Sequence, residues 1–398
     1  MRVLFLTRGY GPDSNASGQL LAELCEGLAE RHVVTVIAGP DTTAAGPSRP
    51  GLWRREHMAG VEVLRTWGTR FGKRSLPGRL LNLATYFLFA FVATFRIERH
   101  DVVVTLTDPP LLGVVGGLLR RRWGCRFVYY CHDLFPDVGE AIGTLRKGFL
   151  AWTLRRGNAY AFRRTDRILA LGEAMRDRIA RKGVDRERIV VLPNWSDVHT
   201  VVPIESSPFR ERFGDRFVVM HSGNMGLMQG LDVLLDAAKR LREEADITFA
   251  LIGAGVSRAS LERRVAKEAI DNVEFMPFQP RSELAASLSA ADLHIVALRS
   301  GVDGCLLPSK VYGVMAAGRP FVAVMDEDAE VAQLARKHQI GFTVRAGDAE
   351  GLAHAILEAR DRSDERHAMG QRARALAEAE YNVERSVQRF DDVLKDLG

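Results

Sequence analysis

Short apolar runs alternate with helical segments along nearly the whole chain, and this alternation limits the possible folds more than any other feature. Runs typical of buried strands are expected at residues 3–7, 33–38, 61–64, 102–105, 127–130, 167–171, 189–192, 218–221, 247–252, 273–276, 293–297 and 321–324. Helical spacing of apolar residues fills most of the intervals, for example at 19–30 and 231–242. Strands that alternate with helices form parallel sheets covered on both faces. The expected fold class is therefore α/β, with doubly wound parallel sheets.

One stretch breaks this pattern. Residues 193–208 contain three prolines among scattered polar residues, which prevents regular structure. A chain of 398 residues is also long for a single core, and 46% of its residues are apolar. We therefore expect two domains, at residues 1–200 and 205–380, with a C-terminal helix at about 381–398 packing back on the first domain.

Composition excludes several classes of protein. The net charge of +5 is small for a chain of this length, which argues against a dedicated nucleic-acid binder but is compatible with anionic ligands. The four cysteines form no CxxC pattern, so neither a zinc site nor a disulfide framework is indicated. The first apolar run is too short for a signal peptide, and the longest, Leu80 to Phe95, is too short to span a bilayer. These features predict a cytoplasmic protein.

The loops that leave the strands are the candidate ligand site, because ligands of open parallel sheets bind beyond the carboxyl ends of the strands. The stretch Ala297 to Pro320 is the most informative of them. It holds Arg299 in a polar loop, then Ser309, whose hydroxyl is expected to cap a helix, and then Lys310 in the first turn. A helix start with a lysine attracts phosphate. An ordinary strand-loop-helix connection is the alternative.

Two further loops carry polar or flexible residues. HSGNMGLMQG has three glycines that permit close approach of a ligand, but its spacing is neither a dinucleotide-binding nor a P-loop fingerprint, which disfavours oxidoreductases and kinases. CHDLFPDVGEAIG holds His132, Asp133, Asp137 and Glu140, which suit proton transfer or contact with substrate hydroxyls. The alternative is that Asp133 or Asp137 caps the following helix.

The chain resembles the retaining family-4 glycosyltransferases of the GT-B fold. The resemblance rests on the order and spacing of five segments: PNW, SGNMGLMQGLDVLLDAAKRL, LIGAG, FQP and LLPSKVYGVMAAGRP. The resemblance is to the branch that builds bacterial O-antigen, colanic acid and capsule. It covers essentially the whole chain. It implies two Rossmann-like domains facing across a cleft, with the acceptor on the N-terminal domain and a nucleotide-sugar donor on the C-terminal one.

The resemblance also implies the site residues. His132 and Asp133 would orient the sugar or the acceptor, and Lys310 would neutralise the leaving diphosphate, so no cofactor and no metal are expected. The implied donor-binding residues are Gly223, Asn224, Gln229, Gly253, Phe278, Gln279, Arg299, Asp303, Gly304, Cys305, Leu306, Leu307, Pro308 and Ser309. The implied loop over the diphosphate or acceptor holds Gly11, Asn15, Ala16, Ser17 and Gly18.

The chain departs from the family pattern in two places. Asn224 and Gln229 stand where the family has an arginine and a lysine that bind the diphosphate, and Cys305 and Gly313 stand where it has two glutamates. We expect Lys310 to replace the lost basic pair. Asp303 or the backbone would take over the contact of the first glutamate near the sugar.

The implied activity is transfer, with retention of configuration, of a hexose or N-acetylhexosamine-type sugar from a nucleotide diphosphate sugar, UDP rather than GDP, to a hydroxyl acceptor. A lipid-diphosphate-linked saccharide of cell-surface polysaccharide synthesis is the expected acceptor. The alternatives are a soluble metabolite or natural product as acceptor, a non-enzymatic nucleotide-sugar-binding protein, a phosphorylase, or a GT-B-like epimerase.

The basic and aromatic run from Arg65 to Arg79 leads into the apolar helix expected at Leu80 to Phe95, a pattern compatible with peripheral contact with an anionic membrane at the inner face of the plasma membrane. The alternative is that this helix packs under the sheet. The expected state is a monomer or weak dimer that binds no nucleic acid.

Overall fold

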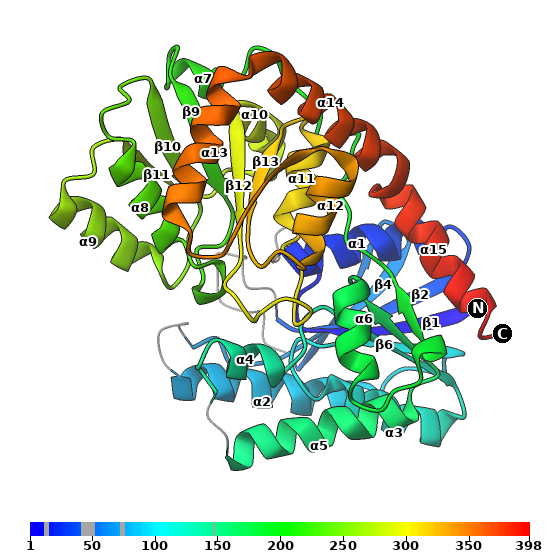
Figure 1. Ribbon diagram of the computed structural model, residues 1–398. Coiled ribbons are helices and arrows are strands. Elements are labelled where there is room, and N and C mark those ends of the chain that lie inside the picture. The colour runs from blue at the N-terminus through cyan, green and yellow to red at the C-terminus, as the bar shows by residue number, and fades with distance from the viewer. Residues whose placement is uncertain (12–15, 41–51, 72–75, 146–147) are drawn as a thin grey trace. The chain divides into compact units, whose positions relative to one another are not determined.

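The computed structural model describes residues 1–11, 16–40, 52–71, 76–145 and 148–398 (Figure 1). The chain forms two compact units. Unit 1 comprises Met1–Pro193 together with Val383–Gly398, and unit 2 comprises Asn194–Asn382. The C-terminal segment therefore belongs to the same unit as the N-terminus.

Unit 1 is built on a sheet of eight strands in the order β3-β4-β2-β1-β5-β6-β7-β8. The strands are β1 (Arg2–Thr7), β2 (Val33–Ala38), β3 (Trp53–Met58), β4 (Val61–Thr66), β5 (Val102–Leu106), β6 (Arg126–Cys131), β7 (Arg167–Ala170) and β8 (Ile189–Val191). The helices are α1 (Ala16–Ala29), α2 (Leu76–Ala93), α3 (Leu112–Trp123), α4 (Asp137–Ala141), α5 (Phe149–Arg164), α6 (Glu173–Ala180) and α15 (Val383–Lys395). β3 is antiparallel to β4, whereas the other strand pairs are parallel.

Helices cover both faces of this sheet. On one face, Leu4 and Leu6 of β1 lie in a core with Tyr86 of α2 and Val115 of α3. On the other face, Phe390 of α15 contacts Phe5, with 5.6 Å between the ring centroids, and also Tyr130. The alternation of side chains along β1 places its two sets of residues on opposite faces.

Unit 2 has a sheet of six parallel strands in the order β11-β10-β9-β12-β13-β14. The strands are β9 (Phe217–Ser222), β10 (Ile247–Ile252), β11 (Val273–Met276), β12 (Leu293–Ala297), β13 (Phe321–Val324) and β14 (Gly341–Val344). The helices are α7 (Pro208–Glu211), α8 (Asp232–Arg240), α9 (Arg258–Glu268), α10 (Leu284–Ser289), α11 (Lys310–Ala316), α12 (Glu330–His338), α13 (Ala349–Asp361) and α14 (Ser363–Glu380).

The core of unit 2 also lies on both sides of its sheet. Phe217 and Val219 pack in a cluster with Leu235 of α8 and Ile356 of α13. Val218 and Met220, which alternate with them, lie in a second cluster that includes Phe213 and Ala290. Both faces of the sheet are therefore buried, as the continuous apolar strands predict.

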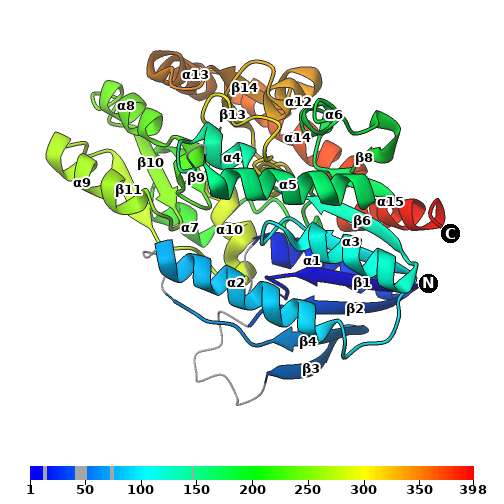
Figure 2. The ribbon, with the colours of Figure 1, turned by 90° about the horizontal axis from the view of Figure 1, so that it is seen from below.

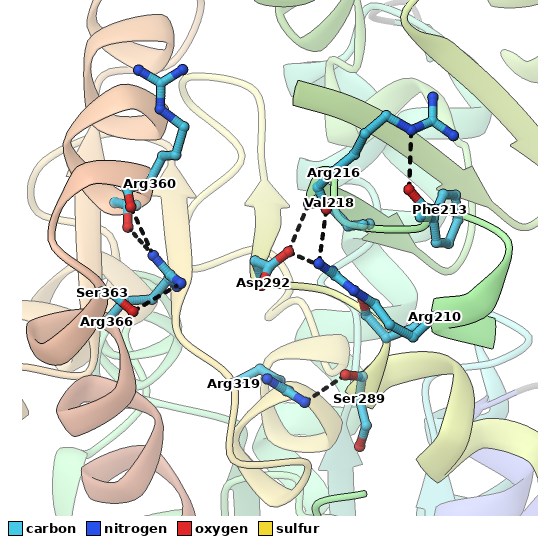
Figure 3. Close-up of polar contacts among 12 residues, drawn as sticks. Arg210, Phe213, Arg216, Val218, Ser289, Asp292, Arg319, Arg360, Ser363 and Arg366 are labelled. Carbon is cyan, nitrogen blue, oxygen red and sulfur yellow. Dashed lines mark hydrogen bonds and ion pairs between the residues drawn. The ribbon is translucent and has the colours of Figure 1, made fainter. Parts of the chain in front are cut away.

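Asp292 joins two strands of unit 2 at the edge where they begin. Its Oδ2 accepts hydrogen bonds from the backbone amide of Val218, at 2.8 Å, and from Nη1 of Arg210, at 2.5 Å (Figure 3). Arg319 donates to the carbonyl of Ser289 nearby, at 2.6 Å. This carboxylate thus holds the starting edge of the sheet, opposite the loops where ligands are expected.

The sheets extend beyond the strands expected from sequence. β3 (Trp53–Met58) was missed because its half-exposed pattern of charged residues lacks an apolar run, as suits an antiparallel edge strand. β14 was missed because it is short and only partly buried. The predicted α/β class is confirmed in both units. Within the described residues no helix combines the length and apolar character needed to cross a membrane.

Candidate active site

Lys310 lies at the carboxyl edge of the unit 2 sheet, beside the end of β9. Its Nζ is 3.0 Å from Nε2 of His221, and a Cβ built on Gly223 would lie 3.3 Å from the same amine. Burial lowers the pKa of Lys310 to about 7. In the described part of the chain no carboxylate pairs with this lysine. The site therefore holds a half-buried amine that a bound anion would stabilise in its charged form.

His221 stays neutral beneath this amine. The ring is fully buried, and burial together with the positive charge of Lys310 holds its pKa well below the usual range. A neutral ring can accept a hydrogen bond from the lysine but adds no positive charge. The pair therefore carries at most one positive charge, which is on Lys310.

Two glycines in the unit 2 loops cannot be replaced without strain. Gly223 and Gly253 have φ values of 136° and 139°, and a Cβ on Gly253 would lie 1.9 Å from the carbonyl oxygen of Gly223. Phe278 lies on the other side of Gly253, with its ring 3.4 Å from the same Cβ position. The loops after β9, β10 and β11 thus meet at Gly223, Gly253 and Phe278, three of the predicted donor-binding residues.

The remaining predicted donor residues of these loops have mixed surroundings. The side-chain oxygen of Gln229 accepts from the amide of Gly226 at 2.9 Å, so this end of the side chain closes its own loop. Arg299 is exposed, and its amide donates to the carbonyl of Met228 at 2.8 Å. Gln279 is partly exposed, and its side-chain amide donates to the carbonyl of Pro277. Arg299 therefore lies next to the β9 loop with its guanidinium available to solvent.

The loop before α11 differs from expectation at Ser309. This residue has helical backbone angles and its side chain makes no capping hydrogen bond, so the predicted hydroxyl cap is wrong. The tight turn Val311 N to Pro308 O, at 3.3 Å, closes the start of the helix instead. The predicted cap failed because serine needs an extended backbone to cap.

Burial separates the other residues of this loop. Cys305 is fully buried, so its side chain packs inside unit 2, and Leu306, Gly304 and Pro308 are also buried. Asp303 and Leu307 are partly exposed. Burial raises the pKa of Asp303 to about 6. Cys305 stands at the position expected for the family's first glutamate, and its side chain is buried. Asp303, two residues before it, is partly exposed and is therefore the one of the two that can reach a ligand.

In unit 1, Thr107 holds the predicted catalytic pair His132 and Asp133. Its Oγ1 accepts hydrogen bonds from both of their backbone amides, each at 3.1 Å. Next to it Asp108 accepts from Arg8, with Nη2 to Oδ2 at 3.0 Å. The loops after β1, β5 and β6 are thereby fastened together at one edge of the sheet. The sequence analysis did not name Arg8 or Thr107 as site residues, although both lie in loops that leave predicted strands, where ligand contacts are expected.

Burial shifts both residues of the pair toward their neutral forms. It lowers the pKa of His132 to about 4, and the ring nitrogen Nε2 is buried without a hydrogen-bond partner. It raises the pKa of Asp133 to about 7, with a further contribution from the charge of Asp108. A neutral imidazole with an unused ring nitrogen and a carboxyl that titrates near neutrality suit contact with hydroxyl groups.

The other two carboxylates of this segment have structural partners. Asp137 pairs with Lys182 at 2.6 Å, and Glu140 pairs with Arg155. Both lie in α4, and their partners come from α5 and from the segment after α6. The structure therefore does not support the expectation that these two carboxylates transfer protons or contact substrate hydroxyls, because each already pairs with a basic side chain.

The first loop is described at its two ends. The amide of Gly11 donates to the carbonyl of Gly18 at 3.4 Å, and α1 begins at Ala16, three residues before the expected start. Ala16 is exposed and Ser17 partly exposed. Asn15 lies outside the described residues. In the parts of the chain that the structure describes, no three His, Cys, Asp or Glu side chains gather as a metal site requires.

Comparison with known proteins identifies the family. A family profile described as "Glycosyl transferase 4-like domain" matches residues 16–195, and one described as "Glycosyl transferases group 1" matches residues 216–361. A Pseudomonas aeruginosa protein named as a probable glycosyltransferase, WbjE, is 30% identical over 330 residues, which cover 81% of this chain and 82% of the relative. The chain belongs to this glycosyltransferase family.

Other relatives of this glycosyltransferase agree. WcaI of Escherichia coli K12, named for colanic acid biosynthesis, is 26% identical over 383 residues, covering 90% of this chain and 92% of the relative. Among solved structures, Anabaena HepE in complex with UDP and glucose matches with a TM-score of 0.77 at 18% identity over the whole of both chains. The two parallel-sheet units of this glycosyltransferase are therefore those of the GT-B fold.

Proposed function

We propose that this glycosyltransferase transfers a hexose or N-acetylhexosamine-type sugar from a UDP-sugar to a hydroxyl group, with retention of anomeric configuration and without a metal ion. Unit 2 would hold the donor, and unit 1 the acceptor. The observation that carries the proposal is Lys310, an amine without a carboxylate partner in the described part of unit 2, at the carboxyl ends of the strands. The UDP and glucose of the HepE complex support the choice of donor.

In this proposal Lys310 binds the diphosphate. The anion raises the pKa of the amine, so the lysine is charged in the complex and stabilises the negative charge that grows on the leaving group. The bond from the anomeric carbon to the diphosphate oxygen breaks, and the acceptor oxygen bonds to the same face of the sugar. Its proton passes to the leaving diphosphate. His132 and Asp133 orient sugar or acceptor hydroxyls.

For the acceptor we propose a lipid-diphosphate-linked saccharide of cell-surface polysaccharide synthesis, which is supported by the name of WcaI, since that name refers to colanic acid biosynthesis. A soluble metabolite is the competing acceptor. A panel of nucleotide sugars, each assayed with lipid-linked and soluble acceptors, distinguishes the two by which pair releases nucleotide. Release of nucleotide without any acceptor, together with an altered sugar, would indicate an epimerase instead.

The experiment on the site is the substitution Lys310→Met. Turnover should fall by roughly 100- to 1000-fold, the usual effect of removing one group that stabilises a charged transition state. Lys337→Met, at an exposed lysine of α12, is the matched control and should retain turnover. Near-normal turnover of Lys310→Met would remove this lysine from the diphosphate site. Product anomers read by NMR test retention, and turnover in excess chelator tests independence of metal.

A further inference from the structure

Helix α2 exposes apolar residues on the side turned away from the sheet. Leu81, Ala84 and Leu88 are all exposed and lie at helical spacing on one face, while Tyr86 and Ala90 of the opposite face are buried in the core. Leu81 is 46% and Leu88 is 56% exposed. A helix that is apolar all round is normally buried on every side. The outer face of α2 therefore lacks the polar residues expected of a free surface.

Helix α5 continues this pattern with aromatic and basic residues. Phe149 is 82% and Trp152 is 53% exposed, and their rings stack with centroids 5.9 Å apart. Arg156 and Arg163 follow on the same helical face and are exposed, and the guanidinium of Arg156 lies 5.6 Å from the centre of the Trp152 ring. These four residues form one stripe along α5.

Helix α3 completes the same side of the unit. It contacts α5 closely, and the guanidinium of Arg122 lies 4.1 Å from the centre of the Phe95 ring just beyond α2. Leu118 and Arg121 of α3 are exposed. Figures 1 and 2 both show α2, α3 and α5 side by side on one face of the unit 1 sheet.

The charge of these three helices has one sign. Their sequences contain one arginine in α2, three in α3 and four in α5, and no aspartate or glutamate. Arg120 and Arg155 pair with Asp166 and Glu140 of neighbouring segments. Arg121, Arg156 and Arg163 pair with no carboxylate anywhere in the described chain, so their charge is open to a partner.

We infer that this basic apolar surface, made of Leu81, Leu88, Leu118, Phe149, Trp152, Arg121, Arg156 and Arg163, docks unit 1 on an anionic lipid bilayer. Leucine and aromatic side chains enter the boundary between headgroups and acyl chains, while the arginines contact anionic headgroups. The inference deepens the proposed function, because a lipid-linked acceptor lies at such a surface. It assigns the contact to α2, α3 and α5 together. Arg65, the first residue of the basic run that precedes α2, pairs instead with Glu56 at 3.0 Å.

Charge favours a bilayer over a second copy of this chain. An isologous dimer through this surface would place arginines opposite arginines, which repel. The paired rings and guanidinium groups of α5 also match the amphipathic side chains that are enriched at membrane interfaces.

The test is flotation of the full-length protein with vesicles of phosphatidylcholine alone and with about a third phosphatidylglycerol. Each arginine near an anionic surface contributes about 1 kcal/mol, so charge reversal in the double variant Arg156→Glu, Arg163→Glu should lower binding to anionic vesicles at least about tenfold. Phe149→Ser with Trp152→Ser should lower it to a similar extent. High salt should weaken binding of the wild type, because salt screens the arginines.

Matched controls change exposed residues outside α2, α3 and α5. Arg240→Glu with Lys337→Glu reverses two exposed charges of unit 2, and Leu52→Ser removes an exposed apolar residue of unit 1, so these variants should bind as the wild type does. Equal binding to neutral and anionic vesicles, unchanged binding by the α5 variants, or no binding at all would overturn the inference. So would a dimer in solution that the α5 variants dissociate.

The outcome is separable from that of the proposed function. Turnover with a soluble acceptor measures the reaction without a membrane, and the α5 variants should retain it. Vesicle binding without any sugar transfer would leave the surface intact and refute the proposed reaction. Sugar transfer without vesicle binding would refute the membrane surface and leave the proposed reaction intact.

Discussion

At the scale of single residues, the two units present groups whose charge depends on burial. Lys310 is an amine with its pKa lowered to about 7, and Asp133 a carboxyl with its pKa raised to about 7. Both shifts have burial as their main cause. A perturbed pKa of this kind is typical of sites that bind or react with charged groups.

The pKa of Lys310 predicts a pH dependence of donor use. If the protonated amine binds the diphosphate, kcat/KM should fall about tenfold per pH unit above pH 7, because the free enzyme loses the proton there. Lys310→Arg should remove this alkaline limb, since a guanidinium stays charged. Titration of Asp133 would change kcat/KM on the acid side of the profile, so its effect can be separated from that of Lys310. A flat profile of the wild type between pH 7 and 9 would contradict the assignment.

At the scale of elements, α15 is fastened to unit 1 by one buried carboxylate. Asp391 is 1% exposed and accepts from Arg31 at 2.9 Å, from His32 at 2.8 Å and from Lys395 at 2.9 Å. Burial alone would raise the pKa of this carboxyl, but the hydrogen bonds from Lys395, His32 and Arg31 outweigh it and hold the pKa below the usual range. The last helix is thus joined to residues that lie near the start of the chain.

The substitution Asp391→Asn should lower the free energy of unfolding of unit 1 by roughly 1.5–3 kcal/mol, because hydrogen bonds between a buried carboxylate and charged groups are lost while Arg31 and Lys395 remain open to solvent. Because the folded pKa is depressed, the stabilisation is present above pH 4 and is lost as the pH falls below it. Denaturant unfolding at pH 7 measures the loss. Asp392→Asn, at the exposed neighbour on the same helix, is the control and should change little. Equal effects of both variants would show that Asp391 is not the anchor.

At the scale of the whole molecule, each unit has its own sheet and its own buried clusters. The chain enters unit 2 at Asn194 and leaves it after Asn382. Separate cores predict that a change within one unit acts mainly on that unit.

Asp292→Ala tests this separation. The variant leaves the amide of Val218 and the guanidinium of Arg210 without their shared acceptor, which should destabilise unit 2 by roughly 1.5–3 kcal/mol. In calorimetry one thermal transition should shift down, while the transition lowered by Asp391→Asn stays in place. A single transition that both variants lower equally would show that the units unfold together.

The sequence alone determined the features that depend on local pattern. Continuous apolar runs between helical segments predicted two parallel-sheet units, because strands buried on both faces need no polar alternation. The order of the glycine loops and the LPSK segment pointed to the glycosyltransferase family, which the comparisons confirm. The edge strand β3 escaped because its charged residues are explained only by its position at the sheet edge.

Tertiary structure decided every feature that joins distant residues. His221 lies 89 positions before Lys310, so no local pattern pairs them, and Asp137 was removed from the candidate acids by a lysine 45 positions away. The exposed apolar and basic residues of α2, α3 and α5 form one surface only because these helices pack side by side on the sheet. Burial and ion pairing are properties of the packed chain, and they decide which of the side chains that the sequence offers remain free to act.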